Sequence, residues 1–132
     1  MVLLAPLHST IELPVLAGRC AAALGDELTA YLAGADTVAE LDAWCAGLPA
    51  PDPGHTIVRL AAGTELIRIF AAENLLSHLR HWLREMIDTE DGPIVPATAI
   101  RTATTDVQPI KTVLHAAHVW VTDQHLHRPL AA

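Results

Sequence analysis

Histidine is the residue type in this sequence with the most evident capacity for chemistry. His78 and His81 lie three residues apart in a segment with helical periodicity, and near the C-terminus His115 and His118 repeat that spacing. Imidazole binds Zn²⁺ and Fe²⁺, so two such pairs on facing helices are weak candidates for a metal site. Metal sites in helical bundles usually add carboxylates from Glu-x-x-His motifs, and the sequence has none. We therefore predict ordinary surface or interface histidines, no metal and no cofactor, and keep a histidine-based metal-binding protein as an alternative.

The other reactive residue types lack the neighbours that catalysis requires. Ser9 and Ser77 lie outside any Gly-x-Ser-x-Gly motif. Cys20 and Cys45 are isolated, without CxxC or metal-ligand spacing, and are predicted to be reduced core residues. The sequence contains no phosphate-binding glycine-rich loop. We predict that the protein is not an enzyme.

Arginine and tryptophan form a second group of candidates. Arg80 and Arg84 lie four residues apart and flank Trp82 on the polar side of a predicted helix. Arginine beside tryptophan is typical of the few residues that dominate a protein–protein interface. The alternative is a solvated helix face on which the arginines pair with Glu85 or Asp88.

These candidates must be positioned by helices, because no stretch alternates convincingly as a strand. Residues 26–48 predict two short helices joined by a tight turn, which is the helix-turn-helix arrangement. Thr37 and Glu40 form a capping box at the start of the second helix, and Gly47 is placed to end it. The outward positions of this helix are acidic or small, and a phosphate-lined groove of DNA would repel them. If DNA is contacted at all, the predicted contacts are Thr37, Ala39, Glu40 and Ala43.

The remaining segments complete an all-α prediction, a compact bundle of about six helices with a helix-turn-helix-like pair near the N-terminus. The predicted segments are an arm at 1–13, a helix at 14–24 opened by Pro14, a loop at 48–55, helices at 56–72 and 75–87, an acidic turn-rich loop, a short helix at 96–101, a last helix capped near Asp106, and a mobile tail from 123. The helix at 56–72 is apolar nearly all round, which indicates a central position or cover by a second subunit. We expect one compact unit with an N-terminal part at 1–48 and a C-terminal part at 56–132.

Composition limits the classes of partner. The 132 residues are 52% hydrophobic, which is ample for a core. Eight Lys and Arg against 15 Asp and Glu give a net charge of −7, whereas proteins that bind nucleic acid usually carry a basic patch. No apolar run reaches the roughly 20 residues that span a bilayer, and the N-terminus lacks the basic region of a signal peptide. We therefore expect a cytoplasmic protein without membrane partners, for which DNA is a disfavoured partner.

The order of motifs resembles the Xre/MbcA/ParS-type antitoxins. The resemblance rests on AYLAGADTVAELDAWCAG (30–47), VRLAAGTELI (58–67), HWLREM (81–86), AIR (99–101) after Pro96, and VLHAAHVWV (113–121). In that family an N-terminal helix-turn-helix part joins a C-terminal helical part that binds a RES-type, NAD-consuming toxin, commonly as dimers or larger complexes. The resemblance implies a packing role for Trp44. The acidic second helix departs from the family and leaves promoter binding in doubt.

We therefore hypothesise an antitoxin-like protein that binds the toxin encoded by a neighbouring gene and occludes its active site, and that itself forms a dimer. The candidate partner-binding residues are Arg80, Trp82, Arg84, Ile100, Arg101, His115 and Trp120. The first alternative is a helix-turn-helix transcriptional regulator, and the second is the metal-binding protein described above.

Overall fold

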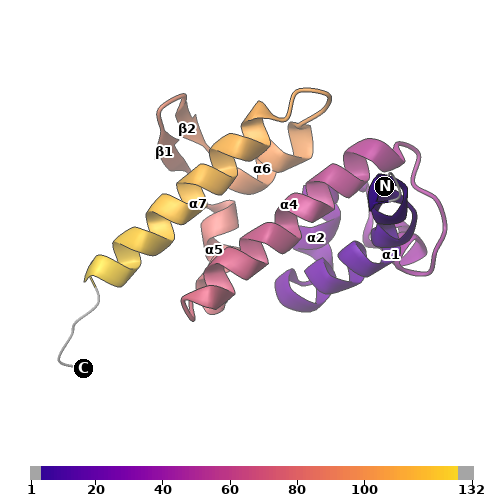
Figure 1. Cartoon of the computed structure of the whole chain (residues 1–132), viewed down its shortest axis with the longest axis horizontal. Coiled ribbons are helices and arrows are strands. Elements are labelled where there is room, and N and C mark those ends of the chain that lie inside the picture. The colour runs from indigo at the N-terminus through magenta and orange to yellow at the C-terminus, as the bar shows by residue number, and fades with distance from the viewer. Residues whose placement is uncertain (1–3, 128–132) are drawn as a thin grey trace.

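The chain forms seven helices and one β-hairpin in a computed structural model that describes the backbone of residues 4–127 and the side chains of residues 13–124 and Leu126 (Figure 1). In chain order the elements are α1 (Leu4–Leu24), α2 (Asp26–Ala33), α3 (Val38–Cys45), α4 (Pro53–Ala72), α5 (Leu76–Arg84), β1 (Ile87–Thr89), β2 (Gly92–Ile94), α6 (Pro96–Thr102) and α7 (Gln108–His127). The predicted all-α fold class is confirmed. In this part of the chain no helix combines the length and apolar character needed to cross a membrane.

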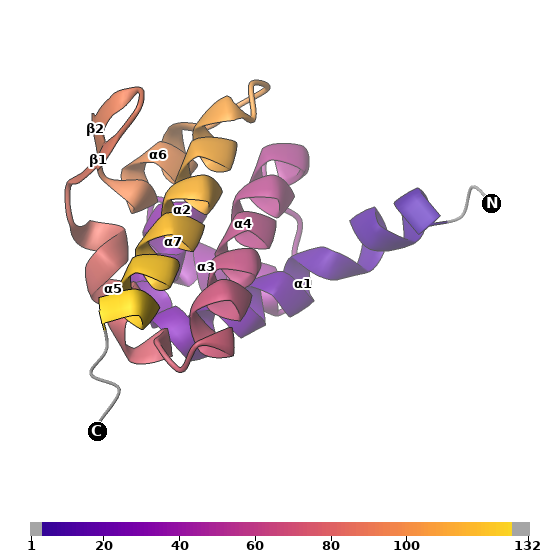
Figure 2. The same ribbon diagram turned by 60° about the vertical axis from the view of Figure 1, so that its left-hand side comes forward.

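Helix α1 begins earlier than predicted. It includes Pro14 in its interior and starts at Leu4, so the predicted arm is wrong for residues 4–13, while residues 1–3 lie outside the described part. The prediction used the preference of proline for a first helical turn. Proline inside a helix removes one backbone hydrogen bond, but this does not prevent helix on both sides. The first turns of α1 project from the rest of the molecule (Figure 2).

The two short helices of the predicted helix-turn-helix are present, with the predicted caps. Gly34 ends α2 in the left-handed conformation, with φ of 90°. Thr37 is the N-cap of α3, where its Oγ1 accepts from the backbone N–H of Glu40 at 3.2 Å. The Glu40 carboxylate accepts from the N–H of Asp36 at 2.8 Å, one residue before the position expected in a capping box. Gly47 follows α3 with φ of 97°, as predicted.

Helix α4 is the centre of the molecule, which is one of the two positions that its all-round apolar character predicts. It packs against α1, α2, α5 and α7, and the buried side chains of both predicted parts of the chain form one hydrophobic core. Trp44 of α3 belongs to this core. Gly63 allows α1 and α4 to approach closely, because a Cβ atom there would lie 2.9 Å from the Sγ atom of Cys20. Helix α7 lies beside α4 and runs in the same direction (Figures 1 and 2).

The predicted acidic loop is a β-hairpin, so the expectation of no strands was wrong here. Helix α5 ends at Arg84 instead of near Ile87, and β1 pairs antiparallel with β2, with Ile87 opposite Ile94. Thr89 fixes the turn, since its Oγ1 donates to the carbonyl of Gly92 at 2.7 Å and accepts from the N–H of Asp91 at 3.1 Å. Strands of three residues are too short to reveal period-two alternation in a sequence.

The C-terminal elements agree with prediction except at the end of the chain. Helix α6 starts at Pro96 as expected, and the carboxylate of Asp106 accepts from the N–H of Gln108 at 3.0 Å at the start of α7. The predicted mobile tail is wrong for residues 123–127, which continue α7, and the rest of that tail lies outside the described residues.

Candidate partner-binding site

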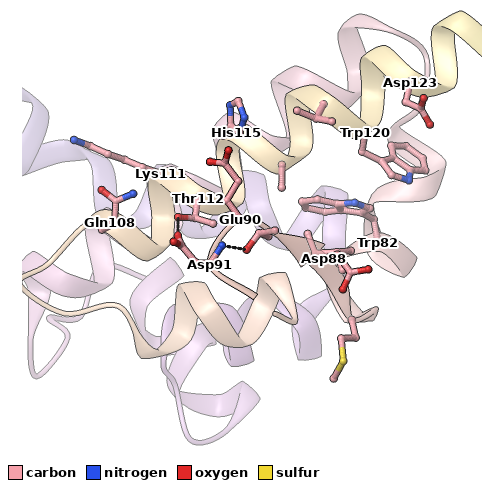
Figure 3. Close-up of a pocket in the computed structure, with 15 residues that line it drawn as sticks. Trp82, Asp88, Glu90, Asp91, Gln108, Lys111, Thr112, His115, Trp120 and Asp123 are labelled. Carbon is pink, nitrogen blue, oxygen red and sulfur yellow. Dashed lines mark hydrogen bonds between the residues drawn. The ribbon is translucent and has the colours of Figure 1, made fainter. Parts of the chain in front are cut away.

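A solvent-open groove of about 1040 Å³ lies between the hairpin and α7, with the end of α5 at one side. Trp82 of α5 and Trp120 of α7 lie near one end, and Gln108 and Lys111 lie near the other (Figure 3). The fold creates this groove because the hairpin directs the chain away from α5 before α6 returns it to the core. Figure 1 shows the hairpin beside α7.

Exposed apolar side chains border the groove from both sides. Met86, which follows α5, is 70% exposed, and Val119 of α7 is 55% exposed. Met86 lies beyond the end of α5, so the helix does not carry its side chain into the core. Large apolar side chains gathered around a concavity are typical of surfaces that bind a partner.

An aromatic cluster holds the floor of the groove in place. The ring of Trp120 stacks on Phe70 of α4, with centroids 5.4 Å apart and 21° between the planes, and Phe70 also lies 5.4 Å from Trp82. Trp82 is only 1% exposed. Its indole N–H has no hydrogen-bond partner among the described residues. An unpaired buried donor costs about 1–3 kcal/mol, and this one is covered by the chain itself.

The hairpin gives the groove an acidic wall. Asp88, Glu90 and Asp91 line it, and the carboxylate of Asp91 accepts from the Thr112 hydroxyl of α7 at 3.3 Å. The side chains of Asp88 and Glu90 form no hydrogen bond or ion pair with the described part of the chain. Glu90 extends towards the side of the groove that carries His115 (Figure 3).

Three of the seven predicted partner-binding residues line this groove, namely Trp82, His115 and Trp120. His115 is exposed and Trp120 is partly buried, so both are accessible to a partner. Trp82 is almost fully covered by its own chain and contributes mainly as the floor. Ile100 is fully buried in the core, so the prediction that its side chain contacts a partner was wrong. The sequence correctly predicted that Ile100 lies in the helix started by Pro96. It did not show which face of that helix is covered by the core.

The predicted arginines lie outside the groove, and two of them bind backbone carbonyls within the chain. Arg80 Nε donates to the carbonyl of Ala23 at the end of α1, at 3.2 Å. Arg101 Nη1 donates to the carbonyls of Tyr31, at 2.7 Å, and Ala35, at 3.2 Å. Cationic side chains stabilise the C-terminal ends of helices, so these two residues have an intramolecular structural role. Arg84 is exposed and forms no interaction with the described residues.

The exposed surface of α3 stays acidic after folding. Of the predicted DNA contacts, Thr37 and Ala39 are exposed, whereas Glu40 and Ala43 are partly buried. The Glu40 carboxylate is occupied by the cap described above. The nearby guanidinium of Arg59 donates to the carbonyls of Ala33 and Ala103 and is not directed at solvent.

The histidines do not form a metal site in the described part of the chain, which holds no group of three or more His, Cys, Asp or Glu side chains able to bind a metal. His78 lies against the ring of Trp120, with centroids 6.0 Å apart. His81 Nε2 lies 3.0 Å from a carboxylate oxygen of Glu85, the residue that follows α5. His115 lines the groove, whereas His118 is exposed beside α4.

The cysteines differ in their surroundings. Cys20 is buried, and burial raises the pKa of its thiol to about 12. Cys45 is exposed, so its predicted core position was wrong. Its pKa is also raised, first by partial burial and then by the nearby carboxylates of Asp42 and Asp26.

The sequence did not reveal the acidic wall of this groove or its two exposed apolar residues, Met86 and Val119. The sequence predicts an acidic loop at residues 88–91, and nothing in the local pattern places this run against Lys111 and Val119 of α7. Comparisons of the chain with protein-family models, with curated proteins and with solved structures found no match.

Proposed function

We propose that this chain is an antitoxin-like protein that neutralises a cognate toxin by direct binding, with the groove between the hairpin and α7 as its contact surface. The observation that carries the proposal is the exposure of Met86 and Val119 around a groove with an aromatic floor. A few well-packed residues near the centre of an interface supply most of its binding free energy once water is excluded, and tryptophan is prominent among them.

The groove is suited to binding and not to turnover. The carboxylates that line it are exposed to solvent, whereas general acids and bases usually lie desolvated in a cleft. Its floor is fixed by the stack of Trp120 on Phe70. Little conformational entropy is therefore lost when a partner binds. A rigid surface of this kind inhibits an enzyme by covering its active site. From the sequence resemblance we propose a RES-type, NAD-consuming toxin as partner, a cytoplasmic location and a dimeric antitoxin.

The test is co-expression with the product of the adjacent gene. We expect the intact chain to restore growth and to co-purify with untagged toxin. Val119→Glu places a charge in the groove and should abolish both. Leu48→Glu is the matched control, because Leu48 is 58% exposed in the loop after α3 and lies outside the groove. Loss of rescue in both variants, or in neither, would contradict the assignment of the groove.

A transcriptional regulator is the second candidate, because α2 and the Thr37-capped α3 are two short helices joined by a tight turn at Gly34, the order of elements in a helix-turn-helix. This function predicts a salt-sensitive gel shift with the promoter of the chain's own gene. Ala39→Lys should strengthen such a shift, since Ala39 is exposed near the start of α3. We favour toxin binding because α3 exposes carboxylates where a DNA-reading helix needs donors.

A further inference from the structure

We propose that the groove receives a basic amphipathic helix of the partner, which sets lysine or arginine side chains against Asp88 and Glu90 and a bulky apolar side chain beside Trp120. This inference rests on the proposed function and specifies the chemistry of the partner. It is argued from the length of the groove, from its apolar floor and from the charges on its two walls.

The length of the groove favours a polypeptide segment over a small molecule. Its α7 wall extends from Gln108 to Asp123, which at 1.5 Å per residue corresponds to about 22 Å, or four helical turns. Small-molecule sites usually enclose their ligand in a volume of about 300–1,000 Å³. This groove lies just above that range, and most of its charged lining is exposed. A helix laid in a groove by its apolar face is a common mode of recognition between proteins.

The apolar lining determines which face of the helix enters. Ile87, Ala116 and Val119 continue the surface of Trp120 along the groove. Burying this strip requires apolar side chains spaced along one face of the incoming helix. The exposed side chain of Met86 is flexible enough to adapt to a bulky group at this end.

The acidic wall determines the charge of the partner. Among the described residues, the side chains of Asp88 and Glu90 are exposed and unpaired, and the carboxylate of Asp91 bonds only to the neutral Thr112 hydroxyl. The only lysine or arginine in the lining is Lys111, which lies at the end away from the tryptophans (Figure 3). With a net charge of −7 on the chain, the surface attracts cations and repels a second copy of itself. The occupant is therefore a basic segment of another protein.

The test uses the full chain and two synthetic helical peptides of 14 residues that share a leucine face. One carries lysine on its polar face, and the other carries glutamate at the same positions. Binding is followed by the emission of Trp120, the most exposed of the three tryptophans, and by amide shifts in ¹⁵N-labelled protein. We expect the lysine peptide to bind at least tenfold more tightly, with shifts concentrated in the hairpin and α7.

Charge variants separate the groove from general attraction to an acidic protein. Asp88→Asn with Glu90→Gln should weaken binding of the lysine peptide about tenfold, and Lys111→Gln should strengthen it. The control is Glu27→Gln with Asp42→Asn, which removes two exposed carboxylates outside the groove and should leave the groove shifts unchanged. Equal binding of the two peptides, or equal loss in both double variants, would overturn the inference. Groove shifts that depend on protein concentration alone would also overturn it, by making a second copy the occupant.

The same variants distinguish failure of the inference from failure of the proposed function. If Val119→Glu abolishes toxin co-purification but loss of Asp88 and Glu90 does not weaken it, the function stands and the basic helix is wrong. If the lysine peptide binds in the groove while the adjacent gene product neither harms cells nor co-purifies, the groove chemistry stands and the antitoxin function is wrong.

Discussion

Arg101 joins the two halves of the chain through Tyr31. Its Nη1 donates to the carbonyl oxygen of Tyr31 at 2.7 Å, and its guanidinium lies 4.7 Å from the centroid of the same residue's ring. Arg59 of α4 completes the arrangement by donating to the carbonyl of Ala33 at 3.4 Å. Two arginines from the C-terminal half thus bind the carbonyl end of α2, and this end of the helix is fixed by residues distant from it in sequence.

Arg101→Ala should lower the free energy of unfolding by about 1–3 kcal/mol, because it removes charge-assisted hydrogen bonds and a cation–π contact at a helix C-terminus. Urea unfolding followed by circular dichroism measures the change. Arg84→Ala is the control, since Arg84 is exposed and forms no interaction with the described residues, and it should change stability by less than about 0.5 kcal/mol. Equal effects of the two substitutions would rule out this role for Arg101.

Gly63→Ala should be less stable than Gly18→Ala by about 1–3 kcal/mol, although both add the same methyl group to a helix. At Gly63 the new Cβ would lie 2.9 Å from Cys20 Sγ, whereas at Gly18 it would meet nothing within 4 Å. Overpacking a close helix contact lowers the free energy of unfolding by about 1–3 kcal/mol. Replacing glycine by alanine at an open helical position raises it by up to about 1 kcal/mol. Thermal unfolding of both variants gives the comparison. Adding Cys20→Ala to Gly63→Ala should recover part of the loss, and strict additivity of the two changes would argue against the clash.

Thr37→Ala should destabilise the protein by about 1 kcal/mol, because the backbone N–H of Glu40 loses its acceptor at the start of α3. Thr37→Ser keeps the hydroxyl and should stay within a few tenths of a kcal/mol of the parent. Amide hydrogen exchange in α3 provides the local measurement. Unchanged protection of the first turn of α3 in Thr37→Ala would show that the cap contributes nothing.

The two thiols should react at different rates with a disulfide reagent at pH 8. Cys45 is exposed and should react in the folded state, more slowly than a free cysteine because its raised pKa reduces the thiolate fraction. Cys20 is buried with a pKa of about 12 and should react only on unfolding. Cys45→Ser should remove the reaction of the folded protein. Rapid modification of two thiols per folded chain would contradict the burial of Cys20.

The raised pKa of Cys20 also predicts a loss of stability in alkali. Below pH 9.0, the ordinary pKa of this thiol, Cys20 is neutral in both the folded and the unfolded chain and contributes no pH dependence. Above that value the unfolded chain loses the proton first and binds fewer protons than the folded chain, so the free energy of unfolding falls as the pH rises towards about 12. The fall should be shallower in Cys20→Ala. The same dependence of the free energy of unfolding on pH in the parent protein and in Cys20→Ala would contradict this prediction.

Local signals explain which parts of the fold were predictable. Helical periodicity, the Thr37 cap and the positions of Gly34, Gly47 and Pro96 act through interactions a few residues long, so the sequence predicts the helices that they bound. Pro14 misled the prediction because its preference for a first helical turn was weaker than the helix formed on both sides of it. The hairpin at 87–94 was missed because its pairing depends on only three residues in each strand.

The sequence by itself determined the helical class, the all-round apolar character of α4 and the acidic surface of α3, since periodicity and charge are properties of the chain before it folds. Only the tertiary structure decided which candidates meet. It placed Ile100 in the core and set Arg101 against α2, and it put His115 and Trp120 opposite the hairpin carboxylates. The physical reason is that a groove depends on how separate elements pack, and packing sums contacts between residues that no local pattern relates.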